Sequence, residues 1–276
     1  MQSNLIHIKG KLYSLDELWI MAILNLSQNS FYEHFDSKST KQLLKHVEGL
    51  MNNGIAILDI GAVSTRPNSE SIPDQDEKKM FSNIISTIKK TFPELLLSVD
   101  TSSELTIEHV MNEGADIIND VSGMQLGDEI LNKIGSNKLA YILTYNKGGK
   151  FNTIKTENSD DILSDALLFI SNKLNKLSAH HINDVIVDPG FGFNKSLADN
   201  YNLLKQSSIF TILNKPILYG LSRKSMIYNL LETTAEGALN GTTVLNTFAV
   251  LNGAQILRVH DTKEAIELKK IASMLT

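Results

Sequence analysis

The stretch VIVDPGFGF (residues 185–193) joins an apolar run to an aspartate, a proline and two glycines that alternate with two phenylalanines. A continuous apolar run of this kind is typical of a strand buried on both faces of a parallel sheet. Asp188 ends the run, and Gly190 and Gly192 can adopt backbone conformations that other residues avoid. The stretch therefore predicts a buried strand that places a carboxylate beside a glycine-rich loop, either as a simple turn or as part of a binding site.

Short apolar runs recur along the whole chain, and amphipathic stretches with helical spacing, such as residues 39–54 and 103–114, lie between them. The eight runs are WIMAILN (19–25), IAILDIG (55–61), LLLSVD (95–100), DIIND (116–120), LAYILT (139–144), DVIVD (184–188), PILYGLS (216–222) and QILRVHD (255–261). Eight strands that alternate with helices over about 250 residues predict an α/β protein with a (β/α)8 TIM barrel.

A doubly wound sheet is the alternative fold. The barrel is favoured because no G-x-G-x-x-G follows the first run and because no change of composition marks a second domain. We therefore expect one domain over residues 1–276. Within residues 1–18 the pattern LIHIKGKLYSL alternates around Gly10, which predicts a short N-terminal β-hairpin.

The composition limits the possible functions. A net charge of −5 argues against binding nucleic acid through phosphate neutralisation, and the chain has no cysteine for a disulfide or a thiolate metal site. No run approaches the roughly 20 apolar residues that a membrane span needs, and the N-terminus lacks the pattern of a signal peptide. We expect a cytoplasmic protein with small-molecule partners and no nucleic acid or membrane partner.

Polar side chains end the predicted strands. They are Asn25, Asp59, Asp100, Asn119, Asp120, Thr144, Asp188, Ser222, Arg223, Lys224, Arg258 and His260. The carboxyl ends of the strands of a TIM barrel meet at one rim, where enzymes of this fold carry their sites. Aspartate and asparagine also favour turns and helix caps, so a single member has an ordinary structural explanation. The whole set indicates a binding site.

Two kinds of chemistry are represented in this set. Carboxylate, amide and ammonium groups at Asp100, Asn119, Asp188 and Lys224 suit the donor and acceptor edge of a flat heterocycle. A second group, formed by Arg66, Arg258 and His260 with Asn25, suits an anion, and an asparagine carbonyl also suits Mg²⁺. We predict a substrate with a planar polar head and a diphosphate, although His260 is also compatible with a core or capping histidine.

The sequence resembles the dihydropteroate synthase family over nearly all of the chain after residue 18. Seven motifs occur in the order typical of that family: ILNLSQNSF (23–31), LDIGAVSTRP (58–67), SVDT (98–101), IINDVSG (117–123), DPGFGF (188–193), SRKS (222–225) and LNGAQILRVHD (251–261). The resemblance implies a pterin-binding TIM barrel. It also implies a transferase that condenses 6-hydroxymethyl-7,8-dihydropterin diphosphate with 4-aminobenzoate, assisted by Mg²⁺, in a homodimer.

The resemblance also implies roles for single residues. The catalytic, pterin-reading residues are Asp100, Asn119, Asp188 and Lys224. Asn25 is the metal-binding residue, and Arg258 and His260 hold the diphosphate with it. The remaining substrate-binding residues are Thr65, Arg66 and Pro67 in the second loop, and Gly192, Phe193 and Ser225. In the implied mechanism diphosphate leaves first, and the aniline nitrogen then attacks the pterin cation.

Three segments depart from the family pattern. They are the first loop (residues 28–35), TYNKGGK (144–150), which stands where the family has Met-His-Met, and Asn68, which replaces a glycine. Two other functions are therefore kept as hypotheses. One is a pterin-binding domain of the methyl-transfer type, against which the SRKS and STRP motifs argue. The other is a catalytically silent homologue, which the altered first loop suggests.

Overall fold

The architecture is a barrel of parallel strands, seen in a computed structural model that describes residues 4–27, 37–62, 72–146 and 162–275. The barrel strands are β3 (Trp19–Asn25), β4 (Ile57–Gly61), β5 (Leu96–Asp100), β6 (Ile117–Asp120), β7 (Ala140–Thr144), β8 (Val185–Asp188), β9 (Leu218–Tyr219) and β10 (Ile256–Val259). They follow the order β8-β7-β6-β5-β4-β3-β10-β9, and a parallel bridge between Val187 and Ile217 brings the two ends together. The predicted (β/α)8 barrel is confirmed.

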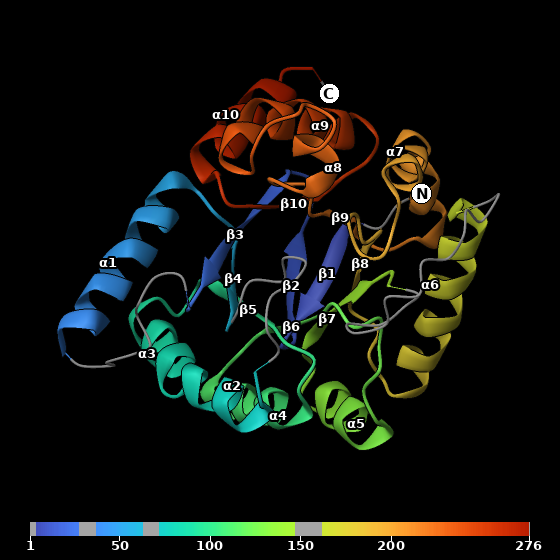
Figure 1. The fold of residues 1–276 in the computed structure, drawn as a ribbon. Helices are drawn as coiled ribbons and strands as arrows, with labels where there is room; N and C mark the ends of the chain where they lie inside the picture. Colours follow the sequence, from blue (N-terminus) through green and yellow to red (C-terminus); the bar gives the residue numbers. More distant parts are fainter. Residues whose placement is uncertain (1–3, 28–36, 63–71, 147–161, 276) are drawn as a thin grey trace.

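Helices surround the strands, as Figure 1 shows. They are α1 (Ser37–Asn53), α2 (Asp74–Phe81), α3 (Ile84–Thr91), α4 (Glu104–Glu113), α5 (Asp128–Ser136), α6 (Ile162–Ala179), α7 (Leu197–Lys205), α8 (Ser225–Tyr228), α9 (Leu239–Leu251) and α10 (Thr262–Ala272), with the 3-10 turns η1 (Ser207–Leu213) and η2 (Glu236–Ala238). Within the described parts of the chain, no helix is long and apolar enough to cross a bilayer.

Local sequence signals set the ends of these elements. Ser103 caps α4, since its hydroxyl accepts a hydrogen bond from the Thr106 amide, and Gly114 ends the helix with φ 109°. The predicted run 216–222 is the exception among the strands, because β9 keeps only two of its residues. Gly220 follows immediately, and residues 222–223 form the turn that leads into α8.

The predicted hairpin closes one end of the barrel. It consists of β1 (Leu5–Ile8) and β2 (Lys11–Ser14), and its buried Ile6 and Ile8 share an apolar cluster with the residues that point into the barrel. The His7 amide donates to Asp184 Oδ1 at 2.8 Å, just before β8, and the Lys9 amide donates to Lys138 O at 2.9 Å, just before β7. Because the hairpin covers the amino ends of the strands, a site must lie at their carboxyl ends.

A buried carboxylate ties this closed end together. Asp116, just before β6, accepts a hydrogen bond from the Leu97 amide at 2.8 Å and lies 2.5 Å from the Lys89 ammonium. The hairpin residue Lys9 lies 3.8 Å from the same carboxylate and donates to Gly114 O. This one side chain thus links the hairpin, α3 and two strands.

We expect Asp116→Asn to lower the free energy of unfolding by about 2 to 4 kcal/mol, because it leaves the partly buried Lys89 ammonium without its counter-charge. Chemical denaturation measures this change. The matched control is Asp76→Asn, which breaks an exposed pair with Lys79 on α2 and should cost less than about 1 kcal/mol. Equal small losses in the two variants would contradict the anchoring role of Asp116.

Candidate active site

A single arginine holds two carboxylates together at the carboxyl ends of the strands. Arg258 of β10 donates from Nε to Asp59 Oδ2 and from Nη2 to Asp100 Oδ2, both at 2.6 Å. Both aspartates are buried, on β4 and β5 respectively. Buried carboxylates need such a partner, since an unpaired charge in this environment would be strongly unfavourable. The sequence placed Arg258 with the diphosphate group, and the structure links it directly to Asp100 of the heterocycle group.

The sequence included Asp59 among the polar strand ends but gave it no role. This residue lies two residues before the end of β4 and is fully buried, so it occupies a deeper layer than the rim. Besides Arg258, it accepts from Ser98 Oγ at 2.7 Å and from Asn119 Nδ2 at 3.1 Å. Asp59 therefore orients the amide of Asn119. An acid within the apolar run ILDIG was the available signal.

A second cluster surrounds the loop that follows β8. The Asp188 carboxylate accepts a hydrogen bond from the Gly190 amide at 2.7 Å, and the Lys224 ammonium donates to Phe191 O. Lys224 Nζ also lies 4.7 Å from the centre of the Phe193 ring. Three of the predicted site residues, Asp188, Phe193 and Lys224, thus belong to one cluster.

Gly192 is required by geometry as well as by backbone conformation. Its φ is 85°, and a Cβ atom at this position would lie 3.2 Å from Lys224 Cδ. A side chain here would strain the backbone and press on the lysine. Gly192 therefore keeps the space that Lys224 needs to reach the loop.

The charges of this cluster are strongly perturbed by burial. Burial raises the pKa of Asp188, opposed by the nearby Lys224 ammonium. Burial likewise lowers the pKa of Lys224 to about 8, opposed by Asp188. A Cβ atom on Gly220 would lie 3.9 Å from both Asp188 Oδ2 and Lys224 Nζ, so the two side chains meet above this glycine. Perturbed groups of opposite charge in one place are typical of functional sites.

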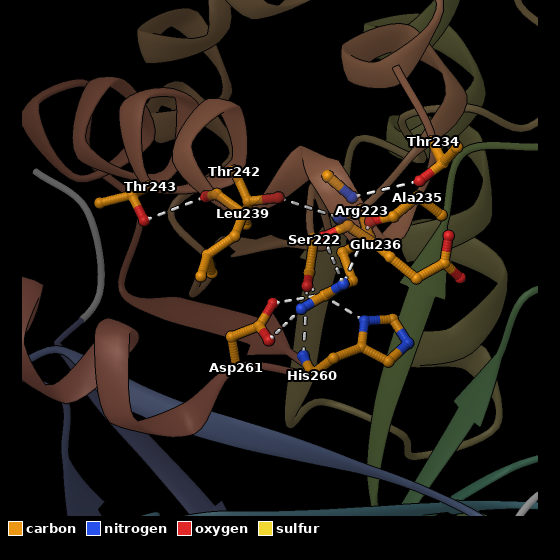
Figure 2. A network of polar contacts seen from close by, with 11 residues as sticks. Ser222, Arg223, Thr234, Ala235, Glu236, Leu239, Thr242, Thr243, His260 and Asp261 are labelled. Atoms are coloured by element: carbon orange, nitrogen blue, oxygen red, sulfur yellow. Dashed lines mark hydrogen bonds and ion pairs between the residues drawn. The ribbon is translucent and has the colours of Figure 1, made fainter.

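His260 and Ser222 form a third part of the site, shown in Figure 2. Ser222 Oγ lies 3.0 Å from His260 Nδ1 and accepts from the His260 amide at 3.2 Å. The His260 side chain is exposed, so it can face a ligand. The alternative of a core histidine is thereby contradicted.

Arg223 turns away from the site, although the sequence set it beside Lys224. Its guanidinium pairs through two hydrogen bonds with Asp261, at 2.7 and 2.8 Å, and donates to the Ala235 and Glu236 carbonyls (Figure 2). Its φ of 54° is a left-handed conformation that favours glycine. These contacts hold the turn that sends Arg223 outward and Lys224 inward.

The remaining predicted residues are placed as follows. Asn25 ends β3, next to the strand of Arg258, and is half-buried in register with Gly61. Ser225 is the first residue of α8. Asp120 faces the opposite side of β6 from Asn119, where its carboxylate accepts from the amides of Ser122 and Met124. Thr65, Arg66 and Pro67 lie outside the described residues.

Lys195 is a residue that the sequence did not single out. Its ammonium donates to the carbonyls of Gly190 at 2.7 Å, Tyr145 at 3.1 Å and Phe193 at 3.2 Å. Three N–H donors thus meet three carbonyls, which fixes the shape of the loop after β8. Burial, followed by the nearby charge of Lys224, lowers the pKa of Lys195 to about 7. The only signal in the sequence was a lysine two residues after the end of DPGFGF.

This arrangement suits a ligand that is partly planar and partly anionic. The carboxylates and amide of Asp100, Asn119 and Asp188 offer hydrogen bonds to a ring edge, and Lys224 and His260 offer positive charge or N–H donors to an anion. No cluster of three His, Cys, Asp or Glu side chains suited to a metal ion occurs among the residues that the structure describes.

Comparison with known proteins gives consistent results at every level. The family model "Pterin binding enzyme" matches residues 21–260. The dihydropteroate synthase of Escherichia coli K12 is 31% identical over 265 residues, which cover 95% of this chain and 93% of the relative. The structure of the Yersinia pestis dihydropteroate synthase with a sulfonamide drug complex has a TM-score of 0.87 and 31% identity over 98% of both chains. That of the Xanthomonas albilineans enzyme with 4-aminobenzoic acid has a TM-score of 0.87 and 27% identity over 99% of this chain and 98% of the other.

The role of Lys195 can be tested by removing and restoring its charge. Lys195→Met should speed hydrogen exchange of the Gly190 and Gly192 amides at least about tenfold at pH 6, where the lysine is protonated, because three carbonyls lose their donors. The chain has no cysteine, so Lys195→Cys supplies a single thiol. Alkylation of this thiol in denaturant with 2-bromoethylamine, followed by refolding, restores an ammonium at nearly the original distance.

We expect the aminoethylated protein to recover slow exchange and the iodoacetamide-treated protein, which carries a neutral group, to stay fast. Lys205→Cys at the exposed end of α7 is the control. In this variant neither reagent should change the hydrogen exchange of the Gly190 and Gly192 amides. Slow exchange in Lys195→Met, or equal recovery with both reagents, would disprove the role of the ammonium.

Proposed function

The chain belongs to the pterin binding enzyme family, and from this premise we propose that it catalyses the dihydropteroate synthase reaction. It is a transferase that joins 6-hydroxymethyl-7,8-dihydropterin diphosphate to 4-aminobenzoate and releases diphosphate. The curated relatives carry this activity by name over nearly the full length of both chains. The methyl-transfer and silent alternatives have no comparable support.

The observation that carries the proposal for the site is the matched set of hydrogen-bonding groups at the barrel mouth. A pterin presents amino and ring N–H donors and, next to them, a carbonyl. Asp188 and Asn119 supply the complementary oxygens, and the Lys224 ammonium supplies a donor for the carbonyl. All three are held in place before the ligand arrives, by Gly190, Asp59 and Phe191 respectively. Such preorganisation favours binding.

The same groups support the chemical step. The bond between the pterin methylene carbon and the diphosphate oxygen breaks, and diphosphate leaves with the electron pair. The cation that results is delocalised over the pterin, where the carboxylates of Asp100 and Asp188 stabilise it. The aniline nitrogen of 4-aminobenzoate then attacks the methylene carbon and gives up its proton to diphosphate or water. Phe193 and Ser225 border the position of this second substrate.

The diphosphate end is assigned to Asn25, Arg258 and His260. Magnesium fits this end only as an ion shared with the substrate, because among the described residues Asn25 offers one amide oxygen and no carboxylate cluster is present. Mg²⁺ commonly keeps water and phosphate ligands in such sites. When bound, it would neutralise the charge that develops on the departing diphosphate.

Two further properties are part of the proposal. The exposed apolar side chains of Val244, Phe248 and Leu251 on α9, with Ile271 on α10, support a homodimer formed through these helices. A substrate that is a charged diphosphate supports a cytoplasmic location, because such an anion does not cross membranes unaided.

The decisive experiment measures diphosphate release with both substrates and Mg²⁺. We expect turnover by the wild-type protein that needs 4-aminobenzoate and is reduced when Mg²⁺ is omitted. Asp188→Ala should lower pterin affinity at least about thirtyfold by calorimetry, since it leaves buried ring donors unpaired. Asp184→Ala, at the opposite end of β8, is the control and should bind pterin within twofold of wild type. Release no faster than with heat-inactivated protein would refute the proposed function.

The low pKa of Lys224 gives a pH prediction. Its ammonium is needed for the pterin carbonyl, so kcat/KM for the pterin diphosphate should fall as pH rises through about 8, well below the ordinary lysine pKa of 10.5. Lys224→Arg keeps the charge at every pH and should abolish this alkaline loss, at reduced overall rate. If the alkaline loss of kcat/KM persists unchanged in Lys224→Arg, another titrating group causes it. Lys195, whose pKa is lowered to about 7, would be the next candidate.

A further inference from the structure

One buried polar atom at the barrel mouth makes no hydrogen bond within the part of the chain that the structure describes. Thr144 is fully buried, and its Oγ1 atom has no hydrogen-bond partner within the described residues. A buried hydroxyl in this condition lowers stability by about 1 to 3 kcal/mol. Buried polar groups are nearly always satisfied, so an exception calls for an explanation.

The position of Thr144 points to the explanation. It is the last residue of β7, in register with Asp188 of β8, so the two side chains share one face of the sheet. Ala140 and Ile142 of the same strand belong to the apolar cluster inside the barrel, and side chains two residues apart point the same way. Thr144 thus faces the interior at its carboxyl end. Asn119 on the neighbouring strand β6 is in register with Ile142, two residues before Thr144.

The orientation of the side chain leaves the hydroxyl available. A Cβ atom built on Gly190 would lie 3.1 Å from Thr144 Cγ2, so the methyl group packs against the loop after β8. The hydroxyl occupies a different position on Cβ and makes no hydrogen bond to the described residues of that loop. The loop itself is fixed by its hydrogen bonds to Asp188 and Lys195, so it cannot move to satisfy the hydroxyl.

We propose that the Thr144 hydroxyl binds the pterin ring directly, as a further polar contact between those of Asn119 and Asp188. This inference rests on the proposed function and names a specificity-determining contact within the same site. Thr144 opens the segment TYNKGGK, in which the chain departs from the family pattern. The ligand supplies the partner that the hydroxyl lacks among the described residues.

The test uses a change that keeps the shape of the side chain. Thr144→Val replaces the hydroxyl with a methyl group, and Thr144→Ser keeps the hydroxyl and removes the methyl. Calorimetry measures the Kd for 6-hydroxymethylpterin, thermal melting measures the stability of the free protein, and steady-state kinetics give the KM for 4-aminobenzoate. A ligand contact and a structural role predict opposite combinations of these values.

We expect Thr144→Val to weaken pterin binding about tenfold while the Tm of the free protein stays the same or rises. Thr144→Ser should keep pterin affinity within about threefold, and neither variant should change the KM for 4-aminobenzoate by more than about twofold. Thr106→Val is the matched control, because this equally buried threonine donates to Glu77 on α2. It should lower the Tm and leave pterin binding unchanged.

Each outcome decides the matter. Unchanged pterin affinity in Thr144→Val overturns the proposal, and so does a fall in Tm that matches the loss of affinity, because a structural water would then be the partner. An equal loss in Thr144→Ser indicates packing alone and also overturns it. Wild-type protein that binds pterin and releases diphosphate, together with an unaffected Thr144→Val, refutes only this inference. Wild-type protein that does neither refutes the proposed function with it.

Discussion

The ion pairs of Arg258 with Asp59 and Asp100 are the interaction on which the mouth of the barrel depends. Two buried carboxylates on adjacent strands repel each other and lose their hydration, and one guanidinium at 2.6 Å from each offsets both costs. The pairs also join β10 to β4 and β5 across the barrel interior. Asn119 takes its orientation from the same Asp59. Removal of Arg258 would therefore disturb three strand ends rather than a single contact.

The loop after β8 follows a different design, in which cations bind backbone carbonyls. Lys195 and Lys224 both donate to carbonyls of residues 190–193, and burial lowers the pKa of each. Both lysines also lie near Asp188, and their charges oppose the rise in its pKa that burial causes. The same two lysines therefore set both the conformation of the loop and the charge around Asp188. The conformation of the loop after β8 and the charge beside it are thus coupled.

The sequence was sufficient for the fold, and for the position of several candidate residues, because both depend on short-range patterns. Apolar runs at regular intervals predicted all eight strands, and the polar residues Asp100, Asn119 and Asp188 lie at the carboxyl ends of their strands, as predicted. The sequence could not predict how deeply Asp59 lies in the barrel, because that depth depends on how the strands are staggered relative to one another. The sequence grouped Arg223 with Lys224, but the left-handed backbone conformation at Arg223 directs its side chain away from that of Lys224. Lys195 was missed because its partners are carbonyls, which every residue carries.

The two ends of the barrel differ in how completely their polar groups are satisfied. At the closed end Asp116 has an amide and an ammonium as partners, and the hairpin excludes water. At the open end the Lys224 and Asp188 charges are held at a cost, and the Thr144 hydroxyl is buried without a partner among the described residues. The hairpin and Asp116 stabilise the strands at their amino ends. The barrel can therefore tolerate, at the carboxyl ends, buried charges and a hydroxyl that lower its stability. Stability and binding are therefore assigned to opposite ends of the same strands.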